Sequence, residues 1–372
     1  MDIPSWFVNP RARDWRTRPL GQDAAAFHRA LPGYAPTRLV ELPQLAAELE
    51  VGRVFVKEES SRFGLPAFKF LGASFAVARE LARRWGVEGV PGLESLRERA
   101  ATEPPVELIA ATDGNHGRAV AHAAALIGLP ARIFFPASIS SAAKTAIAAE
   151  GATAIELDKP YDEVVDAAVA AAAEAGDRGL LVQDSARPGY ESVPAAIVEG
   201  YTTLLAEAFE QMAEAGAEPP GMIAVPVGVG SLAETIVRAV RSRGDETAVL
   251  SVEPSSAPSV IAALAAGEPV AVPTGETIMK GLNCGTVAAN AWPALRDGLD
   301  LAVVVDDAAA LEAMRDLQAL GVDAGPCGAA SLAGARAVLA EPVRRMLTGI
   351  GMSRSVLLLS TEGRAANPLP GS

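Results

Sequence analysis

The chain has 372 residues, half of them hydrophobic, and a formal net charge of −13 at pH 7. This length predicts two domains that share an interface, and the acidic balance argues against nucleic acid as a partner, because phosphate binding needs clustered Lys and Arg. Two cysteines without CxxC spacing and three histidines exclude a structural zinc site, so we expect no metal ion. We expect both cysteines, Cys284 and Cys327, to be buried free thiols.

Neither export nor membrane insertion is predicted from the sequence. Residues 1–15 lack the apolar region of a secretory signal. The longest apolar candidate, 119–135, is interrupted by His122, Pro130 and Arg132, so it is not expected to span a bilayer. We therefore expect a soluble, cytoplasmic protein without a membrane partner.

From about residue 50 onward, short apolar runs alternate with alanine-rich segments of helical character. This alternation predicts an α/β architecture with parallel sheets covered on both faces, whose ligands bind where strands end and helices begin. The expected strands are 51–57, 106–112, 131–136, 152–157, 179–185, 221–228, 247–254, 301–306 and 353–361. The expected helices are 66–85, a segment ending near 127, 140–150, 161–175, 190–215 and a segment starting near 231.

The segment 66–74, Pro-Ala-Phe-Lys-Phe-Leu-Gly-Ala-Ser, places Lys69 between two phenylalanines near the start of a predicted helix. Apolar surroundings and the positive end of a helix both disfavour an ammonium, and a lysine that is neutral part of the time can attack carbonyls. The alternative is a lysine whose tip reaches water. We expect Lys57 to be of that second kind, with the neighbouring 58–59 glutamates as partners.

A polar turn, Asp113–Gly117, separates a predicted apolar strand from the next helix. The side-chain amide of Asn115 could bind a ligand oxygen, and Asp113 is a candidate acid or base. Residues of these types also satisfy local backbone groups in ordinary turns. We expect His116 to be a packing or capping residue.

A glycine loop joins the predicted strand 221–228 to the following helix. Its Gly-x-Gly-Ser sequence can bring backbone N–H groups close to an anion at the positive helix end. The third glycine of a dinucleotide fingerprint is absent, and so is the Gly-Lys-Ser/Thr of a Walker A loop. Phosphate binding and a plain strand-to-helix turn are both open interpretations of this loop.

An amine, a phosphate cradle and a polar turn together suit one cofactor, pyridoxal 5′-phosphate. From about Ile3 to Glu362, the chain resembles the fold type II (tryptophan synthase β-like) pyridoxal-phosphate enzymes, and within them most closely the diaminopropionate ammonia-lyase branch. The stretches that carry the resemblance are VKEESSRFGLPAFKFLGAS, ATDGNHGRAVA, LVQDSARPGYESVP, VGVGSLA, TIMKGLNCGT and LLLSTEG.

The resemblance implies two three-layer αβα domains with mostly parallel, twisted sheets, and the cofactor in the cleft between them. We expect a large cofactor-binding domain made of 1–105 and 190–372, and a small domain, 106–189, that carries the polar turn. The resemblance also implies a homodimer that acts on a small amino acid.

The resemblance assigns cofactor contacts residue by residue. Lys69 matches the lysine that holds the cofactor as a Schiff base, and Asn115 matches the asparagine bonded to its phenolic oxygen. The loop 228–232 matches the phosphate cradle, and Ser360 or Thr361 falls where the family places a hydroxyl against the pyridine nitrogen. The complete set is Phe68, Lys69, Asn115, Gly228, Val229, Gly230, Ser231, Leu232, Ser360 and Thr361.

The implied reaction is α,β-elimination of 2,3-diaminopropionate to pyruvate and ammonia by way of an aminoacrylate. Asp113 and Asp184 match active-site carboxylates of this branch, in which the lysine takes the α-proton from one enantiomer and the aspartate of the turn takes it from the other. One alternative is a serine/threonine dehydratase-like or β-replacement enzyme acting on another β-substituted amino acid. A second alternative is a non-catalytic protein that binds the cofactor.

Three positions depart from the pattern of the branch. Arg364 follows the Ser-Thr-Glu-Gly stretch where an aspartate is usual, and Arg187 replaces a tryptophan. The segment 323–328 replaces a Glu-Ser-Gly stretch and is closer to some serine/threonine dehydratases. If these positions line the substrate pocket, they weaken the assignment of a diamine substrate.

Overall fold

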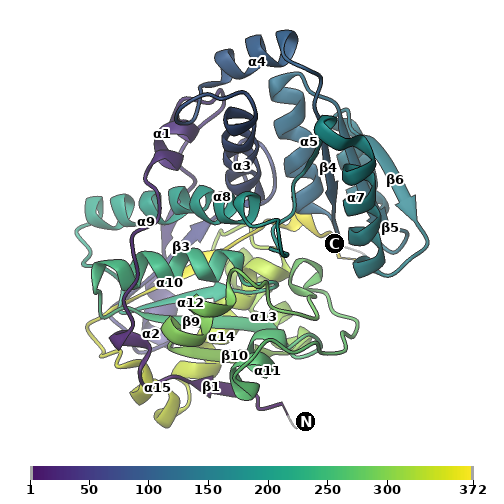
Figure 1. Cartoon of the computed structure of the whole chain (residues 1–372). Helices are drawn as coiled ribbons and strands as arrows, with labels where there is room; N and C mark the ends of the chain where they lie inside the picture. Colours follow the sequence, from purple (N-terminus) through teal and green to yellow (C-terminus); the bar gives the residue numbers. More distant parts are fainter. Residues whose placement is uncertain (1–2, 370–372) are drawn as a thin grey trace.

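The computed structural model describes residues 3–369, which form two layered halves joined by several crossings of the chain (Figure 1). The strands are β1 (Trp6–Val8), β2 (Leu39–Glu41), β3 (Arg53–Glu58), β4 (Glu107–Ala111), β5 (Ala131–Pro136), β6 (Thr153–Leu157), β7 (Gly179–Leu181), β8 (Met222–Pro226), β9 (Ala248–Pro254), β10 (Leu301–Val305) and β11 (Ser355–Ser360). Within the described residues they form a seven-stranded sheet, β1-β10-β9-β8-β11-β3-β2, and a four-stranded sheet, β6-β5-β4-β7. The edge strands β1 and β2 pair antiparallel, and the other pairings are parallel.

The α-helices connect and cover these strands. They are α1 (Asp23–Arg29), α2 (Pro43–Glu48), α3 (Lys69–Arg84), α4 (Leu93–Thr102), α5 (Asn115–Ile127), α6 (Ser141–Ala149), α7 (Tyr161–Ala175), α8 (Ser192–Gly200), α9 (Thr202–Glu214), α10 (Ser231–Arg243), α11 (Ser259–Ala266), α12 (Trp292–Gly298), α13 (Asp307–Ala319), α14 (Pro326–Leu339) and α15 (Pro342–Thr348). Among the described residues, no helix is both long enough and apolar enough to cross a membrane.

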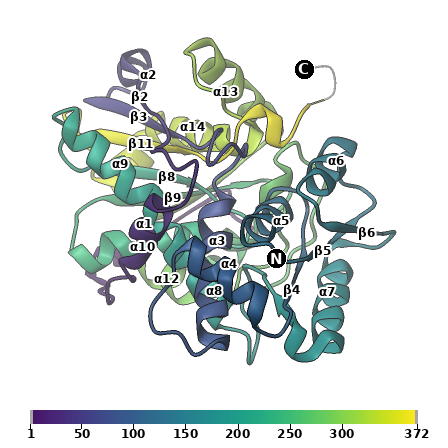
Figure 2. The same ribbon diagram turned by 90° about the horizontal axis from the view of Figure 1, so that it is seen from above.

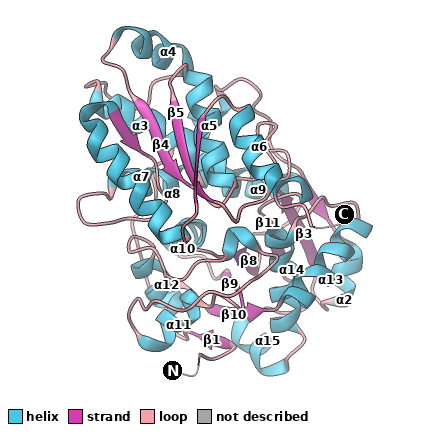
Figure 3. Cartoon of the chain, turned by 90° about the vertical axis from the view of Figure 1, so that its right-hand side faces the viewer, coloured by secondary structure: helices cyan, strands magenta, loops and turns pink. Residues whose placement is uncertain are grey.

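Helices cover both faces of each sheet (Figure 3). In the larger sheet, α14 packs against β8, β9, β10 and β11, while α10 packs against β8 and β9. In the smaller sheet, α5 packs against β4 and β5, and α7 packs against β4, β5 and β7. The predicted α/β fold with mostly parallel sheets is confirmed.

Strand β8 illustrates why the apolar runs become central strands. Ile223 and Val225 pack into one core cluster, whereas Met222 and Ala224 pack into another. Successive side chains of a strand point to opposite faces, so a run that is apolar throughout is stable only where both faces are covered. This condition places β8 in the interior of the sheet.

The strands and helices predicted after residue 50 are present, with one difference. The single helix expected at 190–215 is divided into α8 and α9, which meet at Tyr201. The sequence did not predict β1 and β2, because three-residue edge strands are too short to show an alternating pattern. It also did not predict the helices α1, α2, α4 and α11 to α15.

Helix α3 packs between helices that belong to the two sheets. It packs against α8 on one side and α5 on the other (Figure 2). The smaller sheet is formed by strands lying between residues 107 and 181. The domain boundaries at 105 and 190 remain a prediction.

Lys57, which we expected to reach water beside Glu58 and Glu59, is fully buried. Its Nζ donates hydrogen bonds to Oε2 of Glu207 and to the carbonyl of Thr37, both at 2.8 Å. The expectation is wrong because the partner carboxylate comes from α9, 150 residues away in sequence. Sequence neighbours therefore gave no information about it.

Arg62 completes this buried charge network in the loop between β3 and α3. Its guanidinium donates at 2.7 Å to Glu59 and to Glu207, and the side chains of all three residues are at most 1% exposed. Burial by itself would raise the pKa of Glu207. The opposite effect of Arg62 and Lys57 is larger, and it lowers this pKa to about 2. The network fixes the loop that leads directly to Lys69.

Replacing Glu207 with Gln is expected to lower the free energy of unfolding by about 3–5 kcal/mol, because two buried cations lose a shared partner. Glu210→Gln is a matched control on the same helix, since its pair with Arg29 is exposed, and we expect a loss below about 1 kcal/mol. Urea denaturation measures both values. Equal losses would contradict the assignment.

The stability difference between the wild type and Glu207→Gln should also depend on pH. The pKa of Glu207 lies at about 2, below its ordinary value of 4.5. Its stabilising contribution is therefore complete above about pH 4.5 and is lost as the pH falls toward 2. The difference in stability between the wild type and Glu207→Gln should shrink over that range.

Candidate active site

The predicted site residues follow the carboxyl ends of parallel strands, where open α/β sheets bind ligands. Strand β4 ends before the turn at 113–117, and β8 ends before the glycine loop at 228–232. Strand β11 ends at Ser360, and β3 ends at Glu58, ahead of the loop that leads to Lys69. These ends surround a cavity of about 610 Å³.

Lys69 is the first residue of α3, and its amine reaches the cavity. Nζ donates a hydrogen bond to Oδ2 of Asp184 at 2.9 Å. It also lies 5.5 Å from the centre of the Phe68 ring. Phe70 points away, packing against the rings of Phe63 and His122.

The surroundings of Lys69 favour its charged form. Burial lowers its pKa, but Asp184, Tyr201 and Asp113 together raise it above the ordinary value. For Asp184, burial acts to raise the pKa, but the charges of Lys69 and His116 outweigh burial and lower this pKa to about 2. The expectation that apolar neighbours keep this lysine neutral is therefore wrong for the protein alone, because Asp184 lies 115 residues away in sequence.

The polar turn is held by Thr112, whose Oγ1 accepts the backbone N–H groups of Gly114 and Gly117 at 2.8 and 2.9 Å. Asn115 begins α5, and its amide donates to Oε2 of Glu362 at 2.8 Å. His116 is buried, with Nε2 bonded to the carbonyl of Val182 at 2.8 Å. This contact agrees with the expected packing role.

Asp113 differs from Asp184 in its electrostatic environment. Burial raises the pKa of Asp113, and Lys69 opposes that shift only in part. No ion pair holds its carboxylate among residues 3–369, whereas Asp184 is paired with Lys69. The two aspartates thus face the cavity with different affinities for a proton.

The glycine loop needs glycine at two positions. A Cβ on Gly228 would lie 2.9 Å from Sγ of Cys284. Gly230 has a φ of +103°, and a Cβ there would lie only 2.8 Å from Cδ1 of Leu295. Ser231 begins α10, and its Oγ donates to the carbonyl of Asp184 at 3.0 Å. The loop and the start of α10 both line the cavity.

The end of β11 forms another wall. Ser360 is fully buried, and its Oγ has no hydrogen-bond partner in the described part of the chain. Thr361 and Glu362 line the cavity. Glu362 accepts the backbone N–H of Cys327 at 3.2 Å, and burial raises the pKa of its carboxyl group.

The cavity brings together the predicted residues Phe68, Lys69, Asp113, Asn115, Asp184, Gly228, Val229, Gly230, Ser231, Leu232 and Thr361. Ser360 lies directly behind this wall and is not part of the lining. Sequence reasoning missed Glu362 as a lining residue, although it belongs to the Ser-Thr-Glu-Gly stretch. Cys284 and Cys327 also line the cavity as free thiols, the first partly exposed and the second buried.

The departures from the family pattern lie mostly outside the cavity lining. Arg364 pairs with Asp323 at 3.0 Å, so two of the departures contact each other. Arg187 pairs with Asp166 at 3.2 Å. Within 323–328, only Cys327 lines the cavity in the described part of the chain, so most of the departing residues do not meet the condition under which they would weaken a diamine substrate.

Comparison with known proteins places these features in a family. Residues 30–352 match the family described as "Pyridoxal-phosphate dependent enzyme". The chain is 37% identical over 309 residues to diaminopropionate ammonia-lyase of Salmonella typhimurium, covering 80% of this chain and 75% of that protein. It is 35% identical over 353 residues to the Escherichia coli protein of the same name, covering 91% and 87%.

A crystal structure of diaminopropionate ammonia lyase from Escherichia coli in complex with an aminoacrylate-PLP azomethine reaction intermediate is also similar. The TM-score is 0.83 at 30% sequence identity, over 97% of this chain and 94% of that chain. The similarity thus extends over nearly the whole of both chains.

The ion pair between Lys69 and Asp184 makes a prediction for the protein by itself. Asp184→Asn is expected to lower the pKa of Lys69, because burial lowers this pKa and the carboxylate that opposes burial is then lost. The measurement is the pH dependence of Lys69 labelling by an amine-reactive reagent, read by peptide mass spectrometry. Asp113→Asn serves as the comparison and should shift the midpoint less; an unchanged midpoint in Asp184→Asn would contradict the pairing.

Proposed function

The chain belongs to the pyridoxal-phosphate dependent enzyme family, and from this premise we propose that it is an ammonia-lyase acting on 2,3-diaminopropionate. The products are pyruvate and ammonia. The observation that carries the proposal is the cavity that gathers Lys69, Asp113 and Asp184 at the glycine loop. The near end-to-end similarity to diaminopropionate ammonia-lyases supports it.

The residues present fit pyridoxal 5′-phosphate. The loop 228–232 lines the cavity, its glycines leave no room for side chains at 228 and 230, and the N-terminus of α10 supplies N–H donors for a phosphate. Thr361 lines the cavity, and the buried hydroxyl of Ser360 directly before it has no partner in the described part of the chain, so one of these two hydroxyls is available for a ring nitrogen. We propose that Lys69 holds the cofactor and Asn115 bonds its phenolic oxygen.

When bound, pyridoxal 5′-phosphate links to amines through its carbonyl and stabilises negative charge at the substrate's Cα. We propose that Lys69 takes the α-proton from one enantiomer and Asp113 takes it from the other. Asp184 stabilises the ammonium that Lys69 becomes, since the two groups are 2.9 Å apart. The same pairing holds the proton on Lys69 once it has been transferred.

The charge of the cavity favours a diamine over a hydroxy amino acid. The lining amines are Lys69 and Lys280, and the lining carboxyl groups are those of Asp113, Asp184, Glu276, Asp307 and Glu362. A negative field keeps the β-amine of the substrate protonated, and the ammonium then leaves as ammonia. A β-hydroxyl gains nothing from this field, which disfavours the dehydratase alternative.

A homodimer, a cytoplasmic location and the two-domain division at residues 105 and 190 also belong to this proposal. The homodimer and the domain division rest on the resemblance to the family. Size measurement of the purified protein by light scattering tests the dimer.

Pyruvate formation is the central prediction. The wild type should release pyruvate from diaminopropionate, and Lys69→Ala should lose both this activity and the visible absorbance band of the bound cofactor. Serine and threonine, assayed in parallel through pyruvate and 2-oxobutyrate, test the dehydratase alternative. No pyruvate from either enantiomer of diaminopropionate would overturn the proposal, and a band that no amino acid changes would favour the non-catalytic alternative.

The two proposed bases are separated by enantiomer. Asp113→Asn should reduce turnover of one enantiomer by about 10²-fold or more, the range of general base catalysis, and should affect the other much less. The measurement is kcat/KM for each enantiomer of diaminopropionate. Equal losses for both enantiomers would remove Asp113 from the role of a base.

A further inference from the structure

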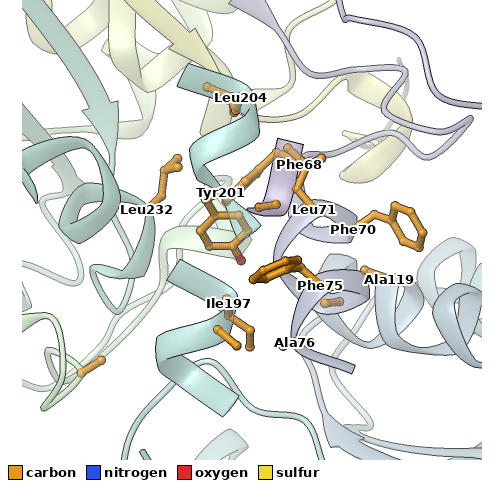
Figure 4. Close-up of a cluster of buried hydrophobic side chains, with 14 of the residues drawn as sticks. Phe68, Phe70, Leu71, Phe75, Ala76, Ala119, Ile197, Tyr201, Leu204 and Leu232 are labelled. Atoms are coloured by element: carbon orange, nitrogen blue, oxygen red, sulfur yellow. The ribbon is translucent and has the colours of Figure 1, made fainter. Parts of the chain in front are cut away.

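Tyr201 is a buried tyrosine close to Lys69 that does not line the cavity in the described part of the chain. It lies where α8 passes into α9, with helical backbone angles of −69° and −13°, and it is fully buried. Its ring centre is 4.7 Å from that of Phe68, the residue before Lys69. Figure 4 shows it between the helices, with Phe68, Leu71 and Ile197 around it.

Helix α3 leaves room for this ring at Gly72, one turn after Lys69. A Cβ on Gly72 would lie 2.6 Å from Cε1 and 2.8 Å from Cζ of Tyr201. Any larger residue at Gly72 would displace the ring. The close approach of α3 and α8 therefore places the phenol beside the first turn of α3, which begins at Lys69.

The hydroxyl of Tyr201 is buried and has no hydrogen-bond partner in the described part of the chain. Burial raises its pKa to about 12, although the nearby Lys69 ammonium acts to lower it. The phenol is therefore protonated at neutral pH. A buried polar group without a partner is rare in proteins and needs a reason, and the nearby Lys69 side chain, which acts on the phenol by charge and by hydrogen bonding, can supply the missing partner.

The Lys69 ammonium has N–H donors available for such a contact. An ammonium carries three N–H groups, and Asp184 accepts one of them. Since a buried charge is costly unless its donors are satisfied, a second acceptor near Nζ would stabilise the ammonium. Tyr201 is a buried group near Lys69 whose hydroxyl has acceptor capacity left.

We propose that the hydroxyl oxygen of Tyr201 accepts an N–H of Lys69 whenever this lysine is an ammonium, in the cofactor-free chain and after it has taken the α-proton, and that Tyr201 is a positioning residue for the base. The inference rests on the proposed function, in which Lys69 takes that proton. With one N–H on Asp184 and another on Tyr201, the third is directed into the cavity. The amine is thereby held in one orientation toward the substrate.

Tyr201→Phe removes the hydroxyl alone and keeps the ring packed against Phe68. In the holoenzyme, where the proposed function has Lys69 bound to the cofactor, the lost hydroxyl has no partner and the Tm should stay equal to that of the wild type or rise. In the cofactor-free full chain, the pH midpoint of Lys69 labelling should fall, since an acceptor for the ammonium is lost. In the holoenzyme, kcat should drop about tenfold or more with KM changed little.

Tyr34→Phe is the matched control. Its hydroxyl donates to Glu207 at 3.0 Å in the resting structure, so its loss should lower the Tm and leave Lys69 labelling unchanged. An unchanged labelling midpoint in Tyr201→Phe, or an unchanged kcat, overturns the role of Tyr201. Absence of pyruvate formation by the wild type would instead overturn the proposed function, and the labelling comparison, which needs no cofactor, is read separately from it.

Discussion

The ion pair between Lys69 and Asp184 is the contact on which the arrangement of the site depends. Lys69 stands at the first position of α3, and Asp184 follows β7 of the smaller sheet. The carbonyl of Asp184 also accepts a hydrogen bond from the Oγ of Ser231 at the start of α10. One aspartate therefore joins the lysine, the smaller sheet and the glycine loop, and a displacement of any of them would open the pair.

This pair also decides the chemical state of the amine. Apolar neighbours would favour a neutral amine, but a carboxylate at 2.9 Å outweighs them and keeps the ammonium. The same environment stabilises the lysine after it has accepted a proton. The pair therefore stabilises the protonated product of proton abstraction, and Lys69 acts as a base only from its neutral form.

A second electrostatic unit holds the chain on the way to Lys69. Arg62 in the loop after β3 is bound to Glu59 and Glu207, and Lys57 shares the second carboxylate. Such buried networks are costly when incomplete and rigid when complete. The loop that carries the lysine into the cavity is thus fixed by α9, a helix that contributes no residue to the described cavity lining.

The sequence by itself determined the fold class and the local motifs: Lys69 after its loop, Asn115 in its turn and the glycines at 228 and 230. Each of these is specified by neighbouring residues and by apolar periodicity, which act over a few positions along the chain. Only the tertiary structure decided the partners: Asp184 for Lys69, Glu207 for Lys57 and Glu362 for Asn115. These pairs join residues more than a hundred positions apart, and the burial that sets their charges exists only once the sheets and helices have packed.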